Sequence, residues 1–370
     1  MTTNLAPLFQ GYELNGVKLE NRLAVAPMTR ISATEDGLAT EAMTRYYERF
    51  AQGGFGLVIT EGLYTDQRFS QGYAFQPGIS DEAQAKSWRP IVDAVHAAGG
   101  KIVAQLMHAG ALSQANRFSE VAAGPSAIQP KGKQMALYRG DGPYSVPRAM
   151  TEADIHEVIA GFSGAASRAI GLAGFDAVEI HGANGYLLDQ FFTDYSNERD
   201  DAWGGTIGQR IRLSAEVLKA VRATLGHSIP VGLRLSQGKV NDFTHQWQEA
   251  EAGAKVVFEQ LSTLGLDYIH LTEFEAWRPA FNDDGPSLVK LARKYSTGST
   301  TVIANGSLHD PVRALDSLSD GADIIALGRG ALSNPNWPNR VRTKNALQAF
   351  DADLLSPLGN LKASELTPVE

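Results

Sequence analysis

The feature that most constrains the fold is a regular alternation of short apolar runs with longer amphipathic stretches. Eight runs rich in β-branched residues lie at 23–27, 56–61, 101–106, 175–180, 229–235, 266–271, 300–305 and 322–327. Most are separated by segments with a helical pattern, the clearest being 81–99, 157–174, 210–226 and 248–265. Strands that are apolar throughout and alternate with amphipathic helices indicate a parallel sheet covered by helices. Eight fairly even repeats predict an α/β chain closed as a (β/α)8 TIM barrel, with an open doubly wound sheet as the competing architecture.

Two segments depart from this repeat. Residues 12–22 contain Asn15 and Gly16 between short alternating runs, which predicts a β-hairpin that could cap the N-terminal end of the barrel. Residues 107–150, rich in Gly, Pro, Gln and Ser, form a long excursion after the third strand. A loop of that length at the catalytic face is typical of a lid or wall over a site, and an ordinary surface insertion is the alternative. We expect 1–370 to be one barrel domain that contains this excursion.

The charge and the cysteine content exclude several classes of protein. The net charge is −8 and no run of Lys or Arg occurs, so we expect neither nucleic acid nor a membrane surface as a partner. The chain has no cysteine, which removes disulfides, thiolate nucleophiles, iron–sulfur clusters and Cys-ligated zinc. Redox chemistry would therefore need an organic cofactor or a metal held by other ligands. The N-terminus lacks the pattern of a signal peptide, so we expect a cytoplasmic protein.

In a barrel of this kind, the active site is built from residues at the carboxyl ends of the strands. The residues found there are Pro27-Met28-Thr29, Thr60-Glu61-Gly62, Gln105 with His108, His181 with Asn184 and Tyr186, Arg234, His270 with Thr272, Asn305-Gly306 and Gly328-Arg329-Gly330. The last two groups put glycines and an arginine where many barrels bind phosphate. A phosphate-bearing ligand is indicated, although glycine after a strand is also ordinary turn chemistry.

The sequence does not predict a catalytic metal. Glu179 and His181 share a strand face, and His270 lies at the end of the sixth strand. However, no HxH or HExxH pattern is present, and carboxylates are scarce at the other strand ends. We therefore expect no metal site.

A set of motifs, taken in order, resembles the Old Yellow Enzyme family of flavin-dependent ene-reductases. The motifs are NRLAVAPMTR (21–30), TEG (60–62), AQLMHAG (104–110), HGANGYLLDQFF (181–192), SNERDDAWGG (196–205), GLRLS (232–236), ANGSL (304–308) and GRGALSNPNWP (328–338). The resemblance implies a (β/α)8 barrel with non-covalent FMN. It also implies reduction by NADH or NADPH, and hydrogenation of alkenes activated by a carbonyl or nitro group.

The same resemblance implies a role for each matching residue. Cofactor-binding positions would be Pro27, Met28, Thr29, Gly62, Gln105, Arg234, Asn305, Gly306, Gly328 and Arg329. Within that set, Thr29 would bind the flavin O4 edge, and Gly62, Gln105 and Arg234 the rest of the pyrimidine ring; Gly306, Gly328 and Arg329 would hold the phosphate. His181 and Asn184 match the pair that binds the substrate's oxygen, and Tyr186 matches the proton donor. A permanently charged Arg234 near N1 and the C2 oxygen would stabilise the negative charge of the reduced flavin.

Each residue also has a structural interpretation. His181 could be a core histidine, Asn184 a left-handed turn residue between glycines, and Tyr186 the first aromatic of a helix packed on the barrel. Rival functions are a 2-hydroxy-acid oxidase, a flavin-binding protein without turnover and a metal-dependent hydrolase. The first would need paired arginines for a carboxylate, which Arg234 alone does not supply. The physiological alkene, the choice between NADH and NADPH, and monomer or homo-oligomer all stay open.

Overall fold

Eight parallel strands form a closed barrel, as the repeat predicted. The computed structural model describes residues 3–367 and 369; residues 1, 2, 368 and 370 of the expected 1–370 domain lie outside the described residues. The barrel strands are β3 (Leu23–Val25), β4 (Leu57–Tyr64), β5 (Lys101–Met107), β8 (Ala177–His181), β9 (Val231–Leu235), β10 (Tyr268–Thr272), β11 (Thr301–Asn305) and β12 (Ile324–Leu327). Their order is β10-β11-β12-β3-β4-β5-β8-β9 with closure, and every neighbouring pair is parallel. The doubly wound alternative is therefore excluded.

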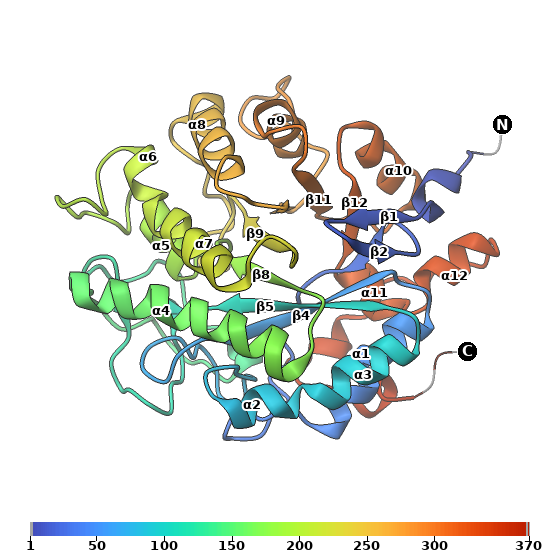
Figure 1. Ribbon diagram of the computed structural model, residues 1–370, viewed down its shortest axis with the longest axis horizontal. Helices are drawn as coiled ribbons and strands as arrows, with labels where there is room; N and C mark the ends of the chain where they lie inside the picture. Colours follow the sequence, from blue (N-terminus) through green and yellow to red (C-terminus); the bar gives the residue numbers. More distant parts are fainter. Residues whose placement is uncertain (1–2, 368, 370) are drawn as a thin grey trace.

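Helices surround the strands on the outside (Figure 1). They are α1 (Glu41–Gln52), α2 (Glu82–Ser87), α3 (Arg89–Ala97), α4 (Glu152–Arg168), α5 (Leu187–Phe192), α6 (Ile207–Arg210), α7 (Arg212–Leu225), α8 (Ala250–Ser262), α9 (Leu288–Tyr295), α10 (Pro311–Ser319), α11 (Arg329–Ser333) and α12 (Trp337–Arg342). The single helix expected over 81–99 is two helices, because Pro90 lacks an N–H and lies in the first turn of α3. The helix expected over 157–174 begins earlier, at a capping box formed by Thr151 and Asp154.

The predicted hairpin closes the N-terminal end of the barrel. Strands β1 (Tyr12–Leu14) and β2 (Val17–Leu19) pair antiparallel through a turn in which Asn15 and Gly16 both have positive φ, 42° and 83°. That is the backbone of a type I′ turn, for which Asn-Gly is the favoured sequence. Leu14 and Leu19 are buried among the inward-facing residues of the barrel. The Tyr12 hydroxyl also makes a 2.8 Å hydrogen bond with the Thr301 side chain.

The filling of the barrel changes from apolar to polar along the strands. At the N-terminal end, the hairpin packs on Ala24, Leu57, Val103, Ala177, Tyr268, Ile303 and Ile324. The ring of Tyr268 fits against Gly232, where a Cβ atom would overlap it. Two residues further along their strands, Glu179 and His270 face the same interior and are joined by a 2.8 Å hydrogen bond. Polar side chains therefore gather at the carboxyl ends, as a TIM-barrel active site requires.

The excursion 107–150 lies at the opposite end of the barrel from the hairpin (Figure 1). It contains two short 3-10 helices, η2 (Gly110–Leu112) and η3 (Ala136–Tyr138), and a two-stranded parallel pair, β6 (Ala123–Gly124) with β7 (Arg148–Ala149). It is therefore folded rather than a plain surface loop.

The C-terminal segment returns to the same end of the barrel. Its residue Glu365 forms a buried ion pair with Arg30, which directly follows Thr29. The Gly359 N–H donates to the Leu137 carbonyl of the excursion at 2.7 Å. No helix of the described residues is both long enough and apolar enough to cross a membrane.

Candidate active site

The residues predicted for the site lie at, or just beyond, the carboxyl ends of the barrel strands. Gly62 and Gln105 lie within β4 and β5, His181 and Arg234 within β8 and β9, and Asn305 ends β11. Pro27, Met28 and Thr29 follow β3, Asn184 and Tyr186 follow β8, Gly306 follows β11, and Gly328 and Arg329 follow β12. Residues from across the sequence are therefore brought to one face of the barrel.

Arg234 is a buried cation with an unused donor. Its Nη2 donates to Asn305 Oδ1 at 3.0 Å, and the same oxygen accepts a 2.7 Å hydrogen bond from Thr272. The Arg234 Nε is buried without a partner among the described residues. Burial lowers the pKa of Arg234 to about 10, opposed by nearby Glu179, so the guanidinium stays charged at neutral pH. A guanidinium at the barrel mouth that is charged and has an unpaired N–H can donate a hydrogen bond to an electron-rich atom of a ligand.

Beneath Arg234 lies a fully buried cluster that the sequence did not predict as a unit. Glu179 accepts a 2.8 Å hydrogen bond from Gln105 Nε2 and another of 2.8 Å from His270 Nδ1. Burial favours the protonated form of Glu179, but His270, Arg234 and Gln105 outweigh it, so the pKa of this carboxyl is lowered. The pKa of His270 is also lowered, in this case by burial itself, and this keeps the imidazole ring neutral. The cluster therefore carries one negative charge directly below the candidate site.

Gly62 and Thr29 occupy positions where the backbone or a small side chain can face a ligand. The register between β4 and β5 shifts between Ile59 and Gly62, which marks a bulge. A Cβ atom on Gly62 would overlap Met107, so only glycine fits there. Thr29 lies near Tyr138 of the excursion, whose pKa burial raises to about 12.

A cavity of about 440 Å³ lies over the ends of β11 and β12. Its lining includes four of the predicted cofactor residues: Asn305, Gly306, Gly328 and Arg329. Because Asn305 also binds Arg234, the cavity borders the barrel mouth. Gly306 has a φ of 144°, and a Cβ there would collide with the Glu273 carbonyl. The volume lies in the range of ligand pockets, and an exposed Arg329 at its wall suits a phosphate.

His181 is a neutral hydrogen-bond donor. Its Nδ1 accepts from the Ala183 N–H at 3.3 Å, so its own proton is on Nε2. Burial, followed by the charge of Arg234, lowers the pKa of His181 well below its ordinary value. The neighbouring Asn184 has a φ of 61°, the left-handed turn conformation that the structural interpretation anticipated. That conformation bends the chain directly after His181, so the turn and site interpretations are compatible.

Tyr186 lies against His181 and is hydrogen-bonded to a second tyrosine. The two rings meet edge to face with centroids 5.0 Å apart. The hydroxyls of Tyr186 and Tyr73 are 2.5 Å apart, and the Tyr73 ring packs on Tyr138 at 4.8 Å. Burial raises the pKa of Tyr186 well above its ordinary value, so the phenol keeps its proton throughout the neutral range. A protonated phenol beside a neutral imidazole donor can serve as a general acid.

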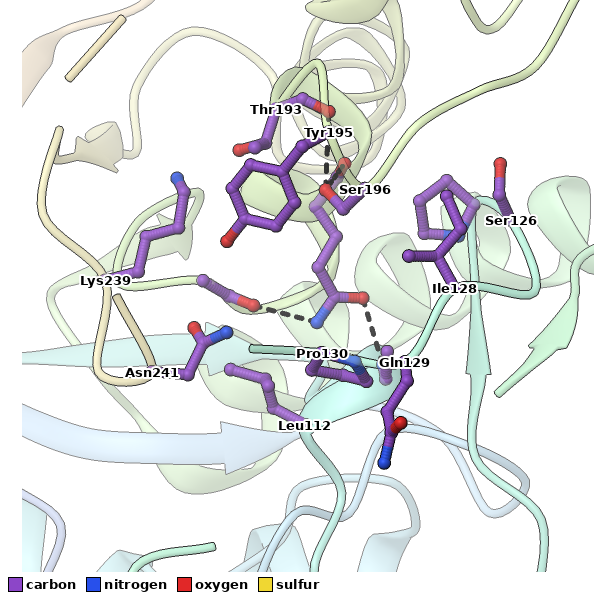
Figure 2. A pocket seen from close by; sticks show the side chains of 14 residues that line it. Leu112, Ser126, Ile128, Gln129, Pro130, Thr193, Tyr195, Ser196, Lys239 and Asn241 are labelled. Carbon is purple, nitrogen blue, oxygen red and sulfur yellow. Dashed lines mark hydrogen bonds between the residues drawn. The ribbon is translucent and has the colours of Figure 1, made fainter. Parts of the chain in front are cut away.

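The turn that carries these residues is fixed from two sides. Asp189 accepts from the Gly185 N–H at 2.6 Å and from Lys239 Nζ at 2.7 Å, in a buried ion pair. Gln190 Nε2 donates to the Gly185 carbonyl at 2.8 Å, and its Oε1 accepts from the Ala111 N–H of the excursion at 2.9 Å. Figure 2 shows side chains that line the seam between the excursion and the turn, among them Leu112 and Gln129 of the excursion with Tyr195 and Lys239. The cavity in this seam has a volume of about 20 Å³, which is room for one water molecule. The excursion and the turn therefore pack closely here, and the seam is too small to bind a ligand.

A profile of the family described as NADH:flavin oxidoreductase / NADH oxidase matches residues 7–348. The chain belongs to this family. A probable flavin mononucleotide-dependent alkene reductase of Leishmania infantum is 34% identical over 339 residues, which cover 90% of this chain and 88% of the relative. The Old Yellow Enzyme homologue of Zymomonas mobilis matches with a TM-score of 0.84 at 33% identity, over 97% of this chain and 98% of that one. Morphinone reductase in complex with tetrahydroNAD matches with a TM-score of 0.85 at 31% identity, over 98% of this chain and 97% of that one.

The resemblance to the Old Yellow Enzyme family is thereby confirmed. The chain is an NAD(P)H-dependent flavin oxidoreductase of this type, and its cofactor is FMN. The side chains fit that cofactor, because the mouth holds a buried cation with an unpaired N–H beside a cavity that ends at Arg329. Within the described residues, no three His, Asp or Glu side chains are grouped as a metal site would require.

Proposed function

We propose that this protein is an FMN-dependent ene-reductase that uses NADPH or NADH to reduce alkenes activated by a carbonyl or nitro group. When bound, FMN would supply the redox chemistry, the transfer of a hydride from the nicotinamide to the β-carbon of the alkene. The observation that carries the proposal is the pairing of two groups, a neutral His181 that donates from Nε2 and a protonated Tyr186 whose ring lies 5.0 Å away.

His181 and Asn184 would hold the oxygen of the substrate's activating group. Negative charge builds on that oxygen as the β-carbon gains hydride, and donors fixed in place before the reaction stabilise it. The Ala183 N–H fixes which His181 nitrogen carries the proton, and the Ser236 hydroxyl accepts from the Asn184 N–H at 2.8 Å. The position of the His181 proton and the backbone that carries Asn184 are therefore fixed by the fold.

Tyr186 would then protonate the α-carbon. Burial raises the pKa of this phenol and so keeps it protonated at neutral pH, and the hydrogen bond with Tyr73 restricts its position. The same substrate pocket would serve the nicotinamide in the other half-reaction. The excursion would act as a wall of this pocket, since Leu112, Tyr138 and Tyr144 pack in one cluster with Tyr186.

The remaining predicted residues would hold the cofactor. Thr29 would bind the flavin O4 edge, and the backbone of Gly62, the Gln105 amide and Arg234 the pyrimidine ring. Gly306, Gly328 and Arg329 would hold the phosphate in the cavity that they line. Pro27, Met28 and Asn305 would complete the walls beside them.

Replacing Tyr186 with Phe tests the proposal by separating the two half-reactions. Loss of a general acid typically slows the proton-dependent step by about 10²- to 10⁴-fold. We expect a loss in that range for flavin reoxidation by cyclohexenone, while flavin reduction by NADPH changes less than about twofold, both measured by anaerobic stopped-flow absorbance. Tyr144→Phe, which removes a hydroxyl from the same cluster without a bond to Tyr186, should leave both rates unchanged. Equal losses in both half-reactions for Tyr186→Phe would remove the acid role.

A further inference from the structure

Glu179 is a buried acid to which the proposed reaction gives no role. It lies on β8 two residues before His181, faces the barrel interior and is fully buried. An ionised carboxylate in such a place is costly unless it is paired and hydrogen-bonded. Here both oxygens are used, one by Gln105 Nε2 and the other by His270 Nδ1, each at 2.8 Å. Because the carboxylate is fully partnered by groups of the candidate site, its position has consequences for those groups.

The first consequence is the orientation of the Gln105 amide. A carboxylate can only accept hydrogen bonds, so the amide must turn its NH2 toward Glu179. The carbonyl Oε1 of Gln105 is then directed away from that bond. Gln105 can therefore accept from an N–H on a ligand at the barrel mouth, such as the ring N–H of the flavin pyrimidine.

The second consequence is a charge balance at the mouth. His270 is neutral and its Nδ1 carries the proton that Glu179 accepts, so it does not cancel the carboxylate. Arg234, the residue predicted to stabilise negative charge on the reduced flavin, lies on the neighbouring strand β9, two residues beyond Gly232, which pairs with Glu179. Its charge acts on Glu179, since Arg234 lowers the pKa of that carboxyl. The other histidine near the pair, His181, is neutral as well. The negative charge of Glu179 therefore offsets the field of Arg234 at the position of the flavin.

We propose that Glu179 is a positioning residue for the cofactor: it fixes the Gln105 amide with Oε1 toward the flavin, and its charge limits how strongly Arg234 favours reduced over oxidised FMN. The inference rests on the flavin site assigned under the proposed function. It predicts that the carboxylate acts on the flavin's redox balance through two neighbours, without touching the substrate.

Glu179→Gln isolates the charge, because it is isosteric and can keep both hydrogen bonds. Its Oε1 can accept from Gln105, and its NH2 can donate to His270 once that ring carries its proton on Nε2, a nitrogen that has no partner among the described residues. We expect reduced FMN to bind at least tenfold more tightly relative to oxidised FMN than in the wild type. For a two-electron couple this is a rise of about 30 mV in midpoint potential. The measurement is an anaerobic redox titration of the holoenzyme at pH 7.

Two further variants make the test specific. Glu179→Asp keeps the charge but withdraws the carboxylate by one methylene group, so we expect weaker binding of oxidised FMN with a reduced-to-oxidised affinity ratio within about twofold of the wild type. Asp176→Asn removes a carboxylate immediately before the same strand, at the far end of the barrel, and should leave the ratio unchanged. If Glu179→Gln does not fold, the Asp variant still decides, since an unaltered affinity for oxidised FMN would overturn the positioning role.

The outcomes separate this inference from the proposed function. A folded Glu179→Gln protein with a wild-type potential would overturn the charge role, even if the enzyme reduces alkenes normally. A wild-type protein that binds FMN but does not reduce activated alkenes would instead contradict the proposed function, while the effect of Glu179 on the potential could still be measured.

Discussion

The two ends of the barrel interior are built from the same strands but by opposite rules. At the N-terminal end, Leu14 of the hairpin packs on apolar side chains and closes the barrel. At the carboxyl end, inward-facing positions carry Arg234, His181 and Gln105, and the Arg234 Nε has no partner within the part of the chain that the structure describes. Gly232 and Arg234 lie two residues apart on β9, yet the first admits a tyrosine ring and the second faces the ligand region. The comparison indicates that stability and chemistry are assigned to opposite ends of each strand, so substitutions at the two ends should have separable effects.

The largest effect on stability is expected at the closed end, from Leu14→Ala. Leu14 is 1% exposed, and removing a large buried side chain costs about 2–5 kcal/mol in folding free energy. The midpoint of urea unfolding should fall, while the stopped-flow rate constants per bound flavin stay at wild-type values. Glu13→Ala, on the same strand but exposed, is the matched control and should change neither quantity. A loss of turnover per bound flavin in Leu14→Ala would break the separation between the two ends.

At the open end, His181→Ala is expected to lower the reaction rate and to leave the stability of the fold unchanged. Removal of one donor to a developing oxyanion typically costs about 10²- to 10³-fold in rate. Flavin reoxidation by cyclohexenone should slow by about that factor, with the urea midpoint and the affinity for FMN close to those of the wild type. A rate within about threefold of the wild type would show that His181 does not hold the substrate's oxygen.

A smaller effect is expected for Arg234→Lys, which keeps the charge but loses the planar fork of donors. Fluorescence titration of the apoprotein should show FMN binding weakened by about tenfold, on the scale of one hydrogen bond to a charged group. Unchanged affinity would place the flavin pyrimidine away from β9.

The smallest effect is expected from pH. The pKa of His181 lies well below 6.5 and that of Tyr186 well above 10, so neither group changes its charge between pH 7 and pH 9. The rate constant for reoxidation by cyclohexenone should vary less than about twofold across that window. The rate constant could instead change stepwise between pH 7 and pH 9 in the wild type but not in Tyr186→Phe. That result would assign the phenol a pKa that its buried surroundings do not explain.

The sequence predicted the barrel because the eight strands are apolar throughout and evenly spaced, and it predicted the hairpin because Asn15-Gly16 favours one turn type. It predicted that the residues at the strand ends would lie on one face of the barrel, because those positions follow from the order of the strands. It did not predict that Tyr73 would bond to Tyr186, since Tyr73 comes from the long loop after β4, whose path depends on tertiary packing.

The buried partners of the site were also missed in part. Glu179 was weighed only as a metal ligand, and His270 as a metal ligand or a residue at a strand end. The bonds of Glu179 to Gln105 and to His270 needed the barrel's register to bring three strands into one layer. The contact of Glu365 with Arg30 joins positions near the two ends of the chain, for which the local sequence pattern gives no signal. The sequence did predict that Glu179 and His181 share one face of their strand, because residues two apart on a strand point to the same side.

The most direct test of the central claim is an anaerobic absorbance measurement on the FMN-reconstituted protein. The account predicts a yellow protein whose flavin absorbance is bleached by NADPH or NADH and returns when cyclohexenone is added, with one alkene reduced for each flavin reoxidised. A protein that retains no FMN after reconstitution, or whose reduced flavin is not reoxidised by cyclohexenone, would contradict it.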